Sequence, residues 1–115
     1  ADQAVWQFFI RRREDPGARI DLVPNDQLDQ SIRLIIAVAN GGLPASALND
    51  ARKLSDGDPD ADNRCKKYFF VAESMLLLGD VVGGLKALEL CEKQSTFYSW
   101  LMRAEAVKWS AQKRQ

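Results

Sequence analysis

The residues KKYFFVAESMLLLGDVVGGLKALELCEKQS, at positions 66–95, decide the fold of this chain of 115 residues. Apolar side chains recur there at intervals of three and four residues, which is the spacing of one face of an α-helix. Gly79 interrupts this pattern, and Asp80 follows it as the predicted N-cap of a new helix. We therefore expect two helices, Arg64 to Leu78 and Val81 to Lys93, with Asp62 or Asn63 capping the first.

The same helical spacing extends outward in both directions, and patterns typical of strands are poor. The first segment ends at Asp15-Pro16-Gly17, and a buried second helix starts near Asn25 or Asp26 and stops at Gly41-Gly42. The sequence thus predicts an all-α fold of five to six helices. The other expected helices are Asp2 to Arg13 with Val5, Trp6, Phe9 and Ile10 on its apolar stripe, Pro44 to Leu54, and Phe97 to about Gln112 with Ser95 or Thr96 as its cap.

Two of the helical hairpins can be superposed on one another as an internal repeat of about 34 residues, with about three extra residues in the connecting loop. Gly42 and Gly79 both end the first helix of a hairpin, and Ala47 and Gly84 both stand five residues later. The further matched pairs are Ile35 with Ala72, Val38 with Met75, Ala51 with Leu88, and Leu54 with Cys91.

This period and pattern resemble the tetratricopeptide repeat (TPR) family. Tyr68 stands at the aromatic position of the family, Ala72 at the small position and Gly79 at the turn, whereas the earlier copy is degenerate, with Ser31 and Ile35 at the first two positions. The resemblance implies antiparallel helical hairpins stacked as a short right-handed solenoid. We expect one repeat domain over 1–115, divided into an N-terminal helix and connector (1–26), a degenerate repeat (27–61), the better repeat (62–95) and a C-terminal capping helix (96–115).

The resemblance also implies a function, because the first helices of such repeats line a concave groove that holds a peptide or a partner helix. We therefore expect a non-enzymatic protein-interaction module or adaptor with an apolar groove. Three alternatives stay open: the N-terminal segment fills the groove itself, the protein is a small chaperone of a secreted or assembled partner, or it is a homo-oligomeric scaffold, for instance a homodimer. The groove positions are Ile32, Ile36, Asn40, Lys66, Phe69, Glu73, Leu77, Tyr98 and Leu101.

The composition excludes several other classes. The 16 basic and 16 acidic residues balance, which disfavours binding of nucleic acid through a broad basic surface. No apolar run is long enough to span a membrane. The chain has no histidine, so Ser-His-Asp and Cys-His catalysis are absent, and no cofactor is expected. We expect a cytoplasmic protein whose N-terminus is processed or truncated, since residue 1 is Ala.

The acidic segment SDGDPDADN, at 55–63, raises the question of a calcium site. An EF-hand loop needs glycine at its sixth position and glutamate at its twelfth. A loop starting at Asp56 or at Asp58 has neither, so we expect a solvated turn and no metal. We further expect free thiols at Cys65 and Cys91, and helical glutamates that do not converge on a catalytic pair. The Arg11-Arg12-Arg13 run is expected to be a solvated helix end, with an anion or acidic-partner site as the alternative.

Overall fold

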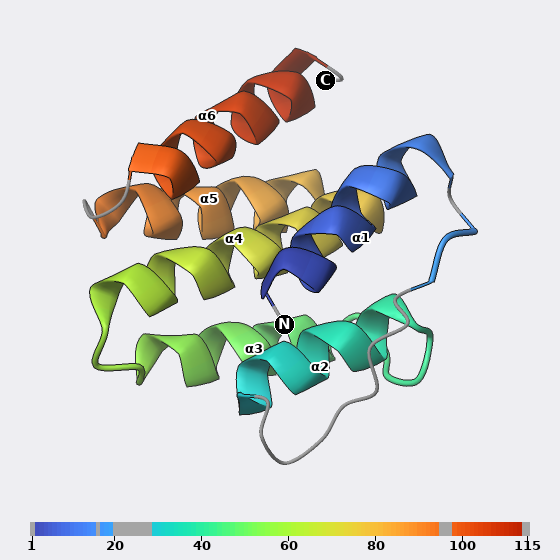
Figure 1. Cartoon of the computed structure of the whole chain (residues 1–115), viewed down its shortest axis with the longest axis horizontal. Coiled ribbons are helices and arrows are strands. Elements are labelled where there is room, and N and C mark those ends of the chain that lie inside the picture. Colours follow the sequence, from blue (N-terminus) through green and yellow to red (C-terminus); the bar gives the residue numbers. More distant parts are fainter. Residues whose placement is uncertain (1, 16, 20–28, 95–97, 114–115) are drawn as a thin grey trace.

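The computed structural model describes residues 2–15, 17–19, 29–94 and 98–113, and these residues form six α-helices and no strand. The predicted all-α class is confirmed. Figure 1 shows the helices in a bundle that measures 33 × 30 × 24 Å. The helices are α1 (Asp2–Glu14), α2 (Gln30–Ala39), α3 (Ala47–Asp56), α4 (Ala61–Leu77), α5 (Val81–Lys93) and α6 (Tyr98–Lys113).

The turn between α4 and α5 is formed as predicted. The carboxylate of Asp80 accepts a hydrogen bond of 2.9 Å from the Gly83 amide, and Gly79 has a φ of +88° that favours glycine. The start of α4 differs from the prediction, because Asp60 caps the helix in place of Asp62 or Asn63. The Asp60 carboxylate accepts hydrogen bonds from the amides of Asp62 and Asn63, which already lie in the helix.

The hairpin of α2 and α3 departs further from the prediction. Pro44 lies outside α3, because the amides of Ala47 and Leu48 bond to carbonyls three residues back and form a tighter turn there. The left-handed glycine is Gly41, with a φ of +81°, and not Gly42. Asp29 caps α2, and its carboxylate accepts a bond of 2.9 Å from the Ser31 amide. The expected caps Asn25, Asp26, Ser95 and Thr96 lie outside the described residues.

Helix α4 occupies the centre of the bundle and packs against each of the other five helices. Every residue from Lys67 to Met75 is buried. A helix that is apolar nearly all round must be covered on all sides. In Figure 1, α5 and α6 lie on one side of α4, α2 and α3 on another, and α1 lies across it.

The central position of α4 corrects an expectation about side-chain burial in α1. Both rings of Phe8-Phe9 and of Phe69-Phe70 are buried within the chain. On α1 the buried stripe includes Phe8, whereas Ile10, which we expected on it, is exposed. The α1 stripe thus follows contacts with α4, which periodicity within α1 does not reveal.

The matched positions of the two hairpins have similar burial in spite of their different turns. Ala51 and Leu88 are both fully buried, as is Cys91, but Leu54, the partner of Cys91 in the repeat, is exposed. Ser55 takes the buried place beside it and donates a hydrogen bond of 2.8 Å to the Ala51 carbonyl. The internal repeat therefore slips by one residue near the end of α3.

Gly84 gives a stability prediction for the contact between α4 and α5. A Cβ at this position would lie 2.7 Å from Leu76 Cγ and 3.3 Å from the Ala72 carbonyl oxygen. We expect Gly84→Ala to destabilise the protein by about 1–2 kcal/mol, because overpacking outweighs the gain of about 1 kcal/mol in helix propensity. Urea unfolding measures the change, with Lys86→Ala on the exposed face of α5 as the control. A Gly84→Ala protein as stable as the wild type would contradict the close contact.

Candidate functional site

The predicted groove is built on the faces of α2, α4 and α6, and α1 lies against the central one of these helices. The Trp6 ring is 5.0 Å from Phe69 and 6.3 Å from Trp100, measured between ring centroids. The guanidinium of Arg103 lies 4.5 Å from the Trp6 centroid, at cation–π distance. The middle of the predicted groove is therefore filled by the N-terminal helix of the same chain, which is one of the alternatives that the sequence left open.

The nine predicted groove residues are consequently divided between the core and the surface. Ile32, Ile36, Phe69 and Glu73 are buried, and the Trp6 ring of α1 lies against Phe69. Asn40, Lys66, Leu77 and Leu101 are half-buried, and the side chain of Tyr98 lies outside the described ones. Two of the nine, Glu73 and Leu77, line open space: Glu73 lines one hollow and Leu77 lines two.

Two hollows adjoin Leu77, one on each side of α4. The first, here called the α4–α6 hollow, has a volume of about 220 Å³. The second, the α1–α4 hollow, has a volume of about 190 Å³. The α4–α6 hollow is lined by Glu73, Leu76, Leu77, Gly79, Val81, Val107, Ser110 and Ala111, and the α1–α4 hollow by Phe8, Phe9, Arg12, Val38, Ala39, Gly41, Ser74, Leu77 and Leu78.

Both hollows are mainly apolar, with a few polar groups. Arg12 and Ser74 line the second hollow, and Glu73 and Ser110 line the first. The sequence pointed to Arg12 and Glu73 but not to the two serines. Next to the hollows, at the turn from α4 to α5, the side chains of Leu78 and Val82 are 52% and 64% exposed. Small concave apolar spaces with few polar groups are typical of ligand and partner sites. No local pattern marks them, because each hollow forms only where separate helices meet.

The acidic segment serves as a structural joint between α3 and α4. Its carboxylates bind donors of the protein: Asp58 accepts from the buried Lys67 ammonium, and Asp56 accepts from the Tyr68 hydroxyl. Arg64 donates a bond of 2.6 Å to the Asp58 carbonyl. Among the described residues, no group of three or more Cys, Asp or Glu side chains is arranged to hold a metal ion.

The buried ammonium of Lys67 lowers the pKa values of two carboxylates around this joint, Asp29 and Asp58. Burial by itself would raise the pKa of Asp29, but hydrogen bonds from Lys67 and Ser31 outweigh it and lower the pKa to about 2. The hydrogen bond from Lys67 likewise lowers the pKa of Asp58. Burial, together with the hydrogen bond to Asp56, raises the pKa of Tyr68 to about 12. The sequence marked Lys67 as part of a helix, but not as a buried cation.

One pair of helical carboxylates, Glu92 and Glu105, lies in contact between α5 and α6. Burial of Glu92 on α5, and then its contact with Glu105 on α6, raise the pKa of Glu92, although the Lys108 ammonium lies 3.5 Å from it. Neither glutamate lines one of the two hollows. The pair therefore has no adjacent space for a substrate in either hollow and belongs to the contact between α5 and α6.

The two cysteines are free and fully buried, as the sequence predicted. A hydrogen bond between the thiols of Cys65 on α4 and Cys91 on α5 raises the pKa of Cys91, to which burial adds, and lowers the pKa of Cys65. Both thiols are fully buried, so the pair contributes to the packing between these two helices.

Comparison of the chain with models of known protein families, with curated proteins and with solved structures gives no match. No helix in the described part of the chain is long and apolar enough to cross a membrane.

The ion pairs of Lys67 with Asp29 and Asp58 give a prediction about the stability of the protein and its dependence on pH. We expect Lys67→Met to lower the free energy of unfolding at pH 7 by about 2–3 kcal/mol. This is less than the loss of about 3–5 kcal/mol for a fully buried pair, because Asp29 is half exposed. Urea unfolding measures the loss, with the exposed Lys53→Met as the control.

The acid dependence of the wild type's stability should be weaker in Lys67→Met. Because the folded-state pKa values of Asp29 and Asp58 are lowered, their stabilisation is fully present above their ordinary value of 3.8 and declines as the pH falls toward 2. In Lys67→Met the stability should change less over this range. An equally steep acid dependence in both proteins would show that the joint contributes nothing to it.

Proposed function

We propose that this chain is a non-enzymatic protein–protein interaction module built from two TPR-like hairpins, α2–α3 and α4–α5, with α6 as the capping helix. The internal repeat and the similar burial of its matched positions support this arrangement. The described residues offer no convincing catalytic group, since the chain has no histidine and its thiols are buried. A binding role fits these features better than catalysis.

The observation that carries the proposal is the α4–α6 hollow. Its apolar walls are formed by Leu76, Leu77 and Val81 from α4 and α5 and by Val107 and Ala111 from α6, with Glu73 and Ser110 as its polar lining. Apolar side chains that face one another across such a space suit an apolar face of a partner helix or an extended apolar segment. We infer that a partner places one or two aliphatic or aromatic side chains in this hollow.

Docking in the open hollow is energetically preferable to displacement of α1. Removing α1 from α4 exposes Val5, Phe8 and Phe9, which are fully buried. Exposure of such a side chain costs about 1.5–3 kcal/mol, so a partner in the predicted groove must first overcome several kcal/mol. A partner in the α4–α6 hollow finds its space already open.

A peptide selection tests this proposal. We expect a random peptide library displayed on phage to yield apolar sequences that bind the full chain, and bound peptides to shift the methyl NMR signals of Leu77 and Val107. Selected peptides that shift only signals on α3, or a failure to select any peptide, would contradict the proposed site.

A blocking variant sharpens the test. Ser110 is exposed and lines the α4–α6 hollow, whereas Gln112 is exposed on the same helix but does not line it. We expect Ser110→Arg to weaken binding of the selected peptides at least tenfold and Gln112→Arg to leave it unchanged, with both proteins within about 0.5 kcal/mol of wild-type stability. Equal affinities of the two variants would place binding elsewhere.

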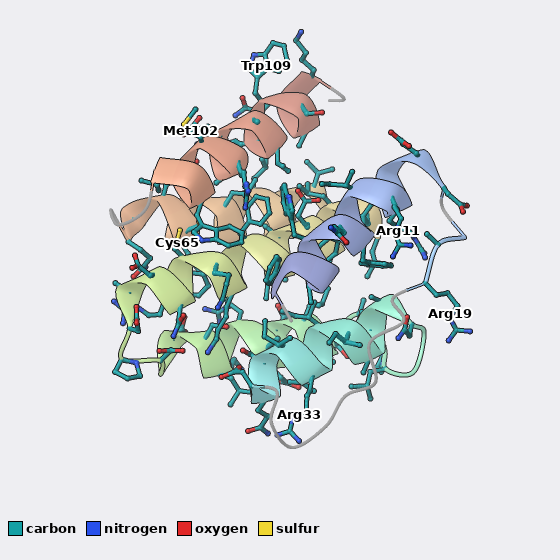
Figure 2. The ribbon with its side chains drawn as sticks, in the orientation of Figure 1. Arg11, Arg19, Arg33, Cys65, Met102 and Trp109 are labelled. Carbon is teal, nitrogen blue, oxygen red and sulfur yellow. The ribbon has the colours of Figure 1, made fainter. Side chains whose placement is uncertain are left out.

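A separate surface favours the homo-oligomeric scaffold as a second candidate function. Met102 and Trp109 on α6 are 70% and 59% exposed, and Figure 2 shows both side chains pointing away from the bundle. The Lys113 ammonium lies 3.5 Å from the centroid of the Trp109 ring. This candidate predicts a dimer in light scattering that Met102→Gln with Trp109→Gln converts to monomer. A wild-type monomer at high concentration would exclude it.

A further inference from the structure

The Ser74 hydroxyl is an unusual feature of the core, because it has no hydrogen-bond partner among the described residues. Ser74 lies on α4 and is only 4% exposed. A buried hydroxyl is normally bonded, and a serine inside a helix usually donates to the carbonyl four residues earlier. The residue lines the α1–α4 hollow, so the unbonded hydroxyl lies at the wall of that space, although its oxygen has less than 1 Å² of accessible surface in this structure.

The hollow has a suitable size and lining for a small apolar group. Phe8 and Phe9 from α1, Val38 from α2 and Leu77 from α4 form its walls. Its volume is about 190 Å³, and an apolar cavity of about 150 Å³ holds a benzene ring. A chain of about six carbons or a single aromatic ring therefore matches this space.

Arg12 adds a positive charge to the same hollow. It is half-buried in the last turn of α1, and one of its nitrogens donates a bond of 2.6 Å to the Ala18 carbonyl. A guanidinium has five N–H donors, so one backbone bond does not exhaust it. Arginine and a serine hydroxyl both donate hydrogen bonds, and the group that accepts from both most strongly is a carboxylate.

The ends of α1, α2 and α4 that adjoin the hollow are C-terminal, and such ends disfavour an anion. Their effect is reduced here, because the last carbonyls of α2 are already bonded. The amides of Asn40, Gly41 and Gly42 bond to carbonyls of α2, and Arg19 donates a bond of 3.0 Å to the Asn40 carbonyl. The cationic side chain of Arg12 thus remains the dominant charge beside the hollow.

We propose that the α1–α4 hollow is a binding site for a small apolar monocarboxylate, an aliphatic or aromatic acid of about six to eight carbons. The apolar part lies between Phe8, Phe9, Val38 and Leu77, and the carboxylate accepts hydrogen bonds from Arg12 and Ser74. This site lies on the other side of Leu77 from the partner hollow. It holds whether or not the protein binds a partner there.

Three probes with the same chain length test the assignment on the full protein by calorimetry: hexanoate, hexan-1-ol and hexylammonium. We expect hexanoate to bind with a dissociation constant in the micromolar to millimolar range, at least tenfold more tightly than hexan-1-ol, and hexylammonium to bind least. Nuclear Overhauser contacts from hexanoate to the methyl groups of Val38 and Leu77 should place it in the hollow.

Variants separate the two polar contacts from general adhesion to apolar surface. Arg12→Gln and Ser74→Ala should each weaken hexanoate about tenfold while leaving hexan-1-ol unchanged, and the exposed Arg11→Gln is the matched control. Ser74→Ala should fold at least as well as the wild type, because it removes an unbonded buried hydroxyl. The proposal is overturned by hexan-1-ol binding as tightly as hexanoate, by equal affinities in all variants, by contacts outside the hollow, or by no binding of any probe.

Discussion

The structure depends on the burial of the central turns of α4, from Lys67 to Met75. Phe69, Phe70, Val71 and Ala72 follow one another in the sequence and have no measurable exposure, so they point to every side of the helix. Such a helix is stable in water only when other helices surround it, because each large apolar side chain left exposed costs about 1.5–3 kcal/mol. The positions of α2, α3, α5 and α6, and the placing of α1 across the predicted groove, all follow from this requirement.

The polar groups of α4 show how the bundle accommodates charge near its core. Lys67 is buried at the N-terminal half of the helix and is neutralised by Asp29 and Asp58. Toward the C-terminal half, Glu73 and Ser74 face the two hollows instead. One end of α4 is thus sealed by an acidic joint, whereas the other is incompletely covered. The incomplete end is where both proposed binding sites lie, a partner site on one side of Leu77 and a carboxylate site on the other.

Local chemistry determined much of the fold. The Gly79-Asp80 turn, the span of α5 and the helical class follow from spacing, a left-handed glycine and an N-cap. Where several acidic residues compete, as at the start of α4, the sequence predicted the helix but not which aspartate caps it. Asp60 is selected because its backbone is extended while Asp62 and Asn63 are already helical. These are interactions within a few residues, so the sequence alone contains most of what is needed to predict them.

Tertiary structure decided the site. Ile36 and Phe69 were expected to line an open groove, but both are buried, and Trp6 of α1 lies against Phe69. The spacing of apolar residues in α1 shows that it needs a partner, but it does not say which helix provides one. The hollows at Leu77, and the unbonded hydroxyl of Ser74, exist only because helices distant in sequence meet there. The sequence by itself determined which segments are helices and where they turn, since those depend on neighbouring residues; the covered groove and the open hollows were decided by long-range packing.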